Sequence, residues 1–232
     1  VPASSITLSP YMYKTNGFDI VRDIKPVALI GISPMMLAVG ADSPANTLSD
    51  LLAMAKKQPD AFVASVPTQF SVPHLAVDLL AKSAGVPLRV VPYSSSSQSI
   101  AAVVGGDAQF TIDGIPPLEA MVQGGRLKAI AAFSEGRLPN RPQLAAATED
   151  FPGLVVNGWF AVMAPQSASP QAVERINQDV ARVVAMPQVV AKLDTLGVYP
   201  RSLSPAAFGD YWRDERLRWE KVLADVGAQR AQ

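Results

Sequence analysis

The sequence contains no cysteine and only one histidine, His74. The lack of cysteine excludes disulfide bonds, thiol catalysis and cysteine-ligated metals, and it is compatible with the cytosol or with an oxidising compartment. A serine–histidine–acid triad would have to use His74, but the chain has no G-x-S-x-G motif. Potential metal ligands do not cluster, and both glycine pairs follow predicted helices instead of preceding them. The sequence therefore predicts no catalytic nucleophile, no metal site and no nucleotide cofactor.

An excess of one charge and long apolar runs are also absent. The 20 Lys and Arg residues balance the 20 Asp and Glu residues, which argues against a nucleic-acid or anionic-membrane partner. Hydrophobic residues make up 49% of the chain, but they are interrupted well before the roughly 20 apolar residues that a membrane-spanning helix needs. The chain opens on Val1 with neither an initiator methionine nor a targeting segment. We therefore expect that an upstream segment, such as a signal peptide, was removed or is not included.

From Val27 onward, short apolar runs alternate with helical patterns, which is typical of a parallel α/β sheet. Proline, glycine, serine and threonine residues mark where the helices begin and end. The predicted strands are 27–30, 36–39, 62–65, 88–91, 110–112, 127–133 and 155–163, and the last three predicted helices are 170–186, 187–196 and 205–226. A chain of 232 residues with this pattern can form one large domain or two lobes.

Three turns that follow predicted strands carry polar side chains. Open α/β sheets bind their ligands at the carboxyl ends of strands, where helix N-termini also present unpaired N–H groups. Each side chain could simply cap the next helix, but together they predict a site for a small anionic or zwitterionic molecule that is bound without reaction. The residues are Thr68, Gln69 and Ser71 in the first turn, Ser94 and Ser95 in the serine run, and Asp113 in the third turn.

Six segments of the chain resemble a known family in their order and spacing. They are "DIVRDIKPVALIG", "TLSDLLAMAKKQP", "PHLAVDLLAKSAGV", "VPYSSSSQSIAAVVGGDAQFTID", "GGRLKAIAAFSEGRLPNRP" and "NGWFAVMAP". Together they look like the solute receptors of tripartite tricarboxylate transporters, also called Bug proteins, over residues 1–227. The resemblance implies a type II periplasmic-binding-protein fold, in which two Rossmann-like lobes are joined by two crossing strands. It also implies a periplasmic receptor, not an enzyme, that closes like a Venus flytrap on a small carboxylate.

On this resemblance, residues 1–32 and 158–232 form a first lobe and residues 33–157 form the second lobe. The family's ligands are di- and tricarboxylates, acidic amino acids and aromatic acids, which the receptor delivers to a membrane permease. The first lobe is incomplete, because its first strand and one carboxylate-binding loop are not in this sequence. If these residues were the whole protein, the exposed edge of that lobe would favour a dimer or weak ligand binding.

The resemblance also implies which residues contact the ligand. Hydroxyl and amide groups are expected to donate to its carboxylate oxygens, and Asp113 to hold an amine, a hydroxyl or a bridging water. His74 and Trp159 are expected to lie behind the contact residues. The expected contacts are Ser4 and Ser5, in a turn at residues 2–5, together with Thr68, Gln69, Ser71, Ser94, Ser95 and Asp113.

The chain departs from the family pattern at two of these turns. Residues 67–71 are bulkier than the usual Gly-Asn-Gly-Thr-like loop, and Tyr93-Ser94-Ser95 replaces Tyr-Lys-Gly, which removes a cation. Two other functions are also considered. A ligand-sensing effector domain, as in LysR-type regulators, would need a basic helix-turn-helix domain that this neutral chain lacks. An α/β hydrolase would require turnover that depends on His74.

Overall fold

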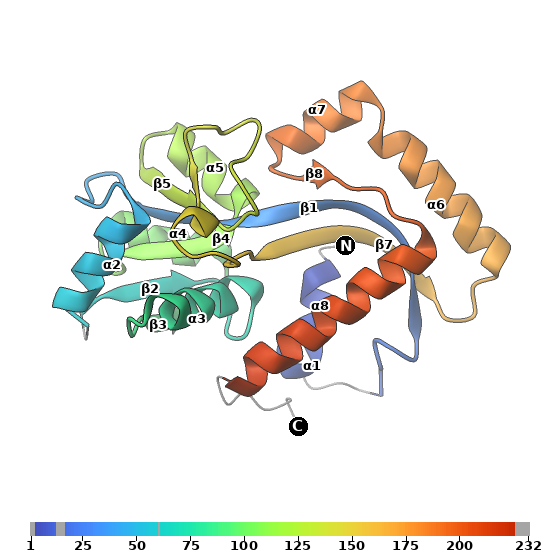
Figure 1. Cartoon of the computed structure of the whole chain (residues 1–232), viewed down its shortest axis with the longest axis horizontal. Coiled ribbons are helices and arrows are strands. Elements are labelled where there is room, and N and C mark those ends of the chain that lie inside the picture. Colours follow the sequence, from blue (N-terminus) through green and yellow to red (C-terminus); the bar gives the residue numbers. More distant parts are fainter. Residues whose placement is uncertain (1–2, 13–16, 60, 226–232) are drawn as a thin grey trace. The chain divides into compact units, whose positions relative to one another are not determined.

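The computed structural model describes residues 3–12, 17–59 and 61–225, and for residues 3–5 and 11–12 it describes only the backbone. The chain forms two compact units. Unit 1 consists of Val1–Ser33 and Gly158–Gln232, and unit 2 of Pro34–Asn157. Both units combine helices with strands, so the predicted α/β class is confirmed (Figure 1).

The sheet of unit 2 has the order β3-β2-β4-β1-β5-β6. Strand β2 is parallel to β3 and β4, whereas β1 is antiparallel to both β4 and β5. The prediction of an entirely parallel sheet is therefore wrong at β1. Because β4 and β5 both oppose β1, their carboxyl ends lie at the same edge of the sheet as those of β2 and β3. The strands are β1 (Ile24–Gly40), β2 (Val63–Val66), β3 (Arg89–Pro92), β4 (Phe110–Gly114), β5 (Leu127–Ala132) and β6 (Ala145–Ala146).

Strand β1 is one strand of 17 residues and not the two short strands expected from the sequence. Its pairing with β8 (Tyr199–Pro200) ends at Ile32, and its pairing with β4 begins at Met35. Pro34, which has no N–H to donate, therefore interrupts neither ladder. Residues 35–39 are all buried, as expected for a strand that is covered on both faces.

Local capping residues define where the helices of unit 2 begin and end. Thr47 forms a capping box with Asp50, and Ser71 and Ser95 cap the next two helices. Gly85 and Gly106 end those two helices with positive φ angles of 60° and 85°. The elements are α2 (Leu48–Lys57), α3 (Val72–Ala84), α4 (Ser96–Gly105), α5 (Ile115–Gln123) and the 3-10 turn η1 (Ala147–Glu149).

In unit 1, the first part of β1 pairs with β7 (Asn157–Pro165) and β8. An aromatic core covers it, in which the Trp159 and Phe208 rings lie 5.6 Å apart, edge to face. The helices are α1 (Ala3–Met12), α6 (Pro170–Val184), α7 (Pro187–Thr195) and α8 (Pro205–Asp225). The turn expected at residues 2–5 is wrong for residues 3–5, whose backbone begins α1.

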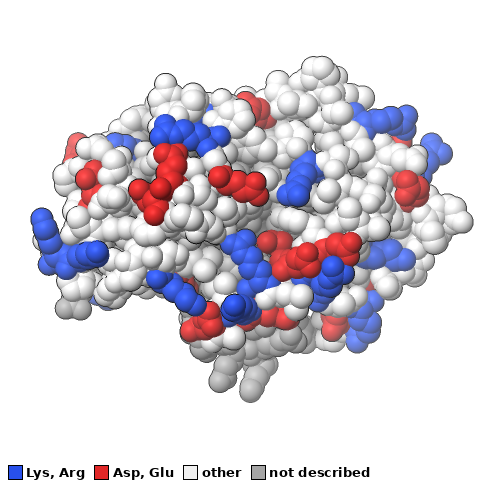
Figure 2. Space-filling model, in the orientation of Figure 1, with Lys and Arg blue, Asp and Glu red and all other residues white. Residues whose placement is uncertain are grey.

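No helix among the described residues is both long enough and apolar enough to cross a bilayer. Basic and acidic side chains alternate over the face shown in Figure 2, without a large patch of one sign. This distribution agrees with the balanced charge of the sequence.

Gly31 provides a test of the close approach between β1 and β8. A Cβ atom at this position would lie 2.6 Å from the Tyr199 carbonyl oxygen and 2.9 Å from Val198 Cγ1. We expect Gly31→Ala to reduce the free energy of unfolding by about 1–3 kcal/mol, since backbone must move. At this chain size, the melting temperature should fall by roughly 2–4 °C per kcal/mol. Gly136→Ala, where a Cβ meets nothing within 4 Å, is the control, and equal melting temperatures for the two variants would contradict this packing.

Candidate functional site

The carboxyl ends of β2, β3 and β4 lie together at one edge of the unit 2 sheet. Val66 pairs with Pro92, and the Tyr93 amide donates to the Val66 carbonyl oxygen at 2.8 Å. Asp113, at the end of β4, lies opposite Met36 of β1. Helices α3, α4 and α5 begin directly after these strands. We call residues 66–74, 92–97 and 113–114 the β4 edge site.

A buried network of hydroxyl groups holds the N-terminal part of α4 on the sheet. The Ser99 hydroxyl lies 3.2 Å from that of Ser65 and 2.9 Å from that of Thr111. The Ser65 hydroxyl donates to the Ser99 carbonyl oxygen at 2.9 Å, and the Thr111 hydroxyl donates to the Ser65 carbonyl oxygen at 2.9 Å. All three side chains are fully buried. Because every one of these hydroxyls has a partner, the network fixes the position of the serine turn.

Asp113 is a buried carboxylate with an incomplete set of partners. Its residue is 7% exposed. Oδ1 accepts a hydrogen bond from the Gly114 amide at 2.7 Å, whereas Oδ2 is buried without a hydrogen bond in the described part of the chain. Burial raises the pKa of Asp113, and the nearby Ser96 hydroxyl and the Gly114 amide oppose this rise. The N-cap of α5 is Gly114, without a side-chain hydrogen bond, so Asp113 does not cap that helix.

The serine run uses two of its four hydroxyl groups, those of Ser94 and Ser95, for local structure. The Ser94 hydroxyl donates to Gln98 Oε1 at 2.6 Å, and the Ser95 hydroxyl accepts from the Gln98 amide at 3.3 Å. The amides of Ser96 and Ser97, in the first turn of α4, donate to no acceptor among the residues that the structure describes. These two amides and the Ser95 hydroxyl hydrogen are therefore available to a ligand.

In the loop after β2, the hydroxyl groups are also bonded to the chain. The Thr68 hydroxyl donates to the Pro67 carbonyl oxygen at 2.6 Å, and the Ser71 hydroxyl donates to the Thr68 carbonyl oxygen at 2.7 Å. A hydroxyl has one hydrogen to donate. In this conformation the hydroxyl hydrogens of Thr68, Ser71 and Ser94 are donated to the chain, and their donation to a ligand carboxylate stays a prediction that would require these hydrogen bonds to change. Gln69, in the same loop, is exposed.

Phe70 has a φ angle of 58°, and it is the one residue other than glycine with positive φ in the described ranges. This left-handed conformation costs about 1–2 kcal/mol for a residue with a Cβ atom. Two contacts with His74 oppose that cost. The Phe70 amide donates to His74 Nδ1 at 2.8 Å, and the two rings stack with centroids 5.8 Å apart and an interplanar angle of 17°.

The His74 imidazole is neutral at physiological pH. Burial lowers the pKa of His74 from its ordinary value of 6.5, and the charge of Asp78 opposes this shift. Burial also raises the pKa of Asp78, whose Oδ2 lies 3.8 Å from His74 Nε2. The position of Nδ1, facing an amide N–H, likewise requires an unprotonated nitrogen.

The structure brings six of the eight expected contact residues, together with His74, to this edge. The backbone of Ser4 and Ser5 lies in α1 of unit 1, and their side chains lie outside the described residues. Trp159 is 1% exposed in the core of unit 1. Ser65, Ser99 and Thr111 were missed, although a serine and a threonine inside the apolar runs "SIAAVV" and "FTI" are a recognisable sign of buried hydroxyls.

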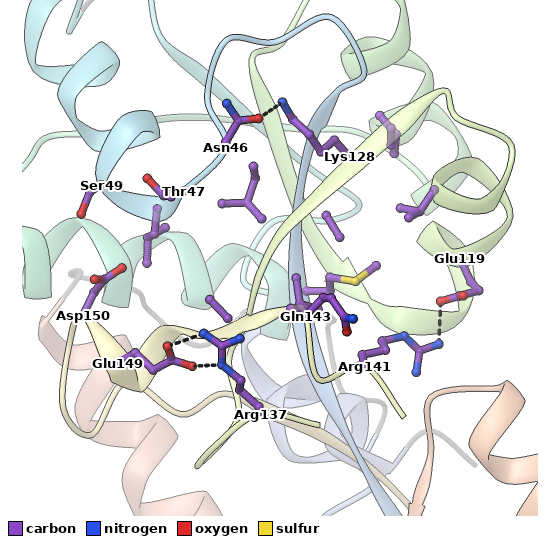
Figure 3. Close-up of a pocket in the computed structure, with 18 residues that line it drawn as sticks. Asn46, Thr47, Ser49, Glu119, Lys128, Arg137, Arg141, Gln143, Glu149 and Asp150 are labelled. Atoms are coloured by element: carbon purple, nitrogen blue, oxygen red, sulfur yellow. Dashed lines mark hydrogen bonds and ion pairs between the residues drawn. The ribbon is translucent and has the colours of Figure 1, made fainter. Parts of the chain in front are cut away.

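Unit 2 also has a groove of about 990 Å³ away from this edge, beside β5 and α5 (Figure 3). Its size is typical of ligand sites, but its cationic groups already have partners. Arg137 forms a bidentate pair with Glu149 at 2.8 and 2.9 Å, and Arg141 lies 2.7 Å from Glu119. Lys128 donates to Asn46 Oδ1 at 2.7 Å.

A carboxylate ligand in this groove would have to displace glutamates that are already bound to arginine. The β4 edge site offers unpaired amides instead, and we therefore favour it for an anion. Within residues 3–12, 17–59 and 61–225, no three histidine, cysteine or carboxylate side chains are grouped to hold a metal ion.

Comparisons with known proteins find a matching family and several relatives. The family described as "Tripartite tricarboxylate transporter family receptor" matches residues 1–228. A UPF0065 protein from the tcbD–tcbE intergenic region of a Pseudomonas strain is 30% identical over 97% of this chain and 68% of its own length. Protein BugT of Bordetella pertussis is 25% identical over 91% of this chain and 65% of its own length. The chain thus spans about two thirds of these relatives.

Solved structures share the fold. A Rhodopseudomonas palustris protein determined with adipate has a TM-score of 0.87 and 28% identity, over 96% of this chain and 75% of that protein. The periplasmic binding protein BugD has a TM-score of 0.83 and 21% identity, over 98% of this chain and 77% of that protein, and it supports the fold alone. The matched family is one of transport receptors, so the expectation of a non-enzyme is confirmed. The chain belongs to the receptor family of tripartite tricarboxylate transporters.

Proposed function

We propose that this chain binds a small organic carboxylate at the β4 edge site and passes it unchanged to a membrane permease. The observation that carries the proposal is Asp113, whose buried Oδ2 has no hydrogen-bond partner among the described residues, at the same edge where the amides of Ser96 and Ser97 donate to none of these residues. A buried polar group without a partner calls for an explanation, and a bound ligand that completes its hydrogen bonds provides one. An anion would bind the amides, and a hydrogen-bond donor on the same molecule would bind Asp113.

The chemistry of the edge favours recognition by dipoles. None of residues 66–74, 92–97 and 113–114 is a lysine or arginine. The unpaired amides of α4 carry the positive end of the helix dipole, which stabilises negative charge. A ligand carboxylate therefore belongs at the serine turn and not beside Asp113, where two carboxylates would repel each other.

The adipate complex of the 28% identical relative supports the carboxylate class. For this chain we propose a finer class, a dicarboxylate that carries a hydroxyl or amino group, because Asp113 needs a donor. The periplasmic location, the interlobe cleft and the permease partner that the resemblance implies are parts of the same proposal.

Calorimetry and thermal shift with malate and succinate test the ligand class. These two acids differ by one hydroxyl group. We expect malate to bind about tenfold more tightly, since a hydrogen bond to a charged acceptor contributes about 1.5 kcal/mol or more. Saturating malate should then raise the melting temperature more than succinate does. Equal affinities would contradict the donor requirement, and a lack of binding by malate, aspartate, succinate and adipate alike would contradict the carboxylate receptor itself.

Asp113→Asn should improve stability and impair binding. Burial raises the pKa of Asp113 above its ordinary value of 3.8, so the ionised form destabilises the fold once the pH exceeds that raised pKa. The ligand-free variant should therefore melt at a higher temperature than the wild type at pH 7. The difference should shrink as the pH falls and the wild-type carboxyl group takes up a proton.

The same variant should bind malate about tenfold more weakly and succinate with nearly unchanged affinity, because only malate donates to Oδ2. Asp107→Asn, on an exposed residue, is the matched control. An Asp113→Asn variant that is less stable at pH 7 would show that the carboxylate has partners essential to the fold.

A further inference from the structure

We propose that His74 is a positioning residue that holds Phe70 in its left-handed conformation and thereby fixes the loop Thr68–Ser71 for ligand binding. This inference rests on the proposed function, because it assigns a role to one loop of the β4 edge site. It gives the single histidine of the chain a function that requires no catalysis. The role belongs to the neutral imidazole.

The conformation of Phe70 requires an external restraint. Residues with a Cβ atom rarely adopt a φ of 58°, and glycine is the usual residue in such a turn. Phe70 is followed directly by Ser71, the N-cap of α3, and preceded by the exposed Gln69. If Phe70 relaxed to negative φ, the chain between the end of β2 and the start of α3 would change its path. The loop would then lose the Ser71 to Thr68 hydrogen bond of 2.7 Å.

His74 supplies the restraint from the first turn of α3. Its Nδ1 accepts the Phe70 amide hydrogen at 2.8 Å, and its ring stacks on the Phe70 ring. The backbone amide of His74 is bound to the Ser71 hydroxyl at 3.4 Å, so the histidine is itself anchored at the helix start. His74, four residues after Phe70, thus provides the acceptor for the Phe70 amide hydrogen.

Only the neutral imidazole can make this contact. Protonation would place a hydrogen on Nδ1, directly opposite the Phe70 N–H, and the hydrogen bond would be replaced by two donors facing each other. Burial keeps the pKa of His74 below 6.5, so the contact is present at neutral pH and is lost as the pH falls through the lowered pKa.

The charged groups near His74 are few. Asp78, on the same helix, faces Nε2 at 3.8 Å and favours protonation. Helix α3 packs on β2, β3 and β4. Strand β2 has no charged residue, β3 begins with the exposed Arg89, and β4 ends near Asp113. The variants Asp78→Asn and Asp113→Asn each remove one carboxyl group. Their pH profiles therefore distinguish the titration of His74 from the titration of these two carboxyl groups.

The ligand-free chain provides the first test, which does not depend on any ligand. Because there is one histidine, 15N NMR resolves its two ring nitrogens without ambiguity. At pH 8 we expect the hydrogen on Nε2, a bare Nδ1, and slow hydrogen exchange at the Phe70 amide that becomes fast as the ring is protonated. A hydrogen on Nδ1 at pH 8, or Phe70 exchange that does not follow the titration, would overturn the proposal.

Three variants then separate positioning from general stability. His74→Asn keeps an acceptor, since Asn Oδ1 occupies the place of Nδ1, but it does not titrate. His74→Leu removes the acceptor. Phe70→Gly, combined with His74→Leu, removes the need for a restraint, because glycine adopts positive φ freely. Melting temperatures and circular dichroism establish that each variant is folded.

Malate binding at pH 8 should weaken about tenfold in His74→Leu, as expected for the loss of one restraining hydrogen bond. His74→Asn and the Phe70→Gly/His74→Leu double variant should keep an affinity for malate within about threefold of the wild type. As the pH falls through the lowered pKa of His74, at the value that the NMR titration gives, wild-type affinity should fall more steeply than that of His74→Asn, in which Asp113 and the ligand still titrate. Wild-type affinity in a folded His74→Leu, or no recovery in the double variant, would overturn the role.

Failure of this proposal is distinguishable from failure of the proposed function. If the wild type binds none of the four acids, the receptor proposal fails, and the NMR titration still decides whether His74 holds Phe70. If malate binds and the NMR titration gives the predicted tautomer, but His74→Leu and His74→Asn share one affinity and one pH profile, the receptor proposal stands and the positioning role fails.

Discussion

The arrangement of unit 2 depends on the position of β1 in the sheet. This strand lies between β4 and β5 and is antiparallel to both. Since β2 and β3 run parallel to β4, four strands end at the same edge, and three helices begin there. Residues 35–39 of β1 are buried on both faces, so a register shift of one residue would exchange the side chains that pack on the two faces and disrupt both layers of the core. The packing of β1 therefore determines where the polar turns meet.

Two unfavourable features lie at that edge, a buried carboxylate oxygen without a partner and a phenylalanine with positive φ. The buried hydroxyl groups of Ser65, Ser99 and Thr111, in the same unit, bond to one another. Features that reduce stability persist where the surrounding structure is rigid enough to hold them, and they concentrate at functional sites. The hydroxyl network beneath α4 provides that rigidity, because it fixes the serine turn beside Asp113.

The sequence predicted the elements of the fold well, because the signals for helix ends are local. Thr47, Ser71, Ser95, Gly85 and Gly106 act within a few residues of their positions. The direction of β1 could not be predicted, since strand pairing depends on partners more than 70 residues away, such as Asp113 for Met36. The break expected between the predicted strands 27–30 and 36–39 does not occur. Pro34 lies between two ladders, where its missing N–H costs no hydrogen bond, and which positions are paired is a tertiary property.

The sequence predicted that the three polar turns would lie together more readily than it predicted the hydrogen bonds of their side chains. Strand ends and helix starts identified the three turns, but whether a hydroxyl donates to a ligand or to the chain depends on which carbonyl lies within about 3 Å of it. For Thr68 and Ser71 that acceptor is in the same loop. The left-handed Phe70 could not be predicted, since the sequence lacks the glycine that normally marks such a turn.

The lack of a basic residue in these turns has a consequence for how a ligand would be oriented. A lysine would attract any carboxylate from several directions, because an ammonium group is a mobile point charge. The two amides at the start of α4 are fixed in direction, so they donate to a carboxylate that approaches from one side only. Asp113 repels the same group and accepts only a donor. A molecule that carries both groups can therefore bind in one orientation, with its carboxylate at Ser96 and Ser97 and its hydroxyl or amine at Asp113. Selectivity at such a site comes from the placement of neutral dipoles around one buried acid, and it should depend little on ionic strength, because no exposed ion pair with the protein is formed.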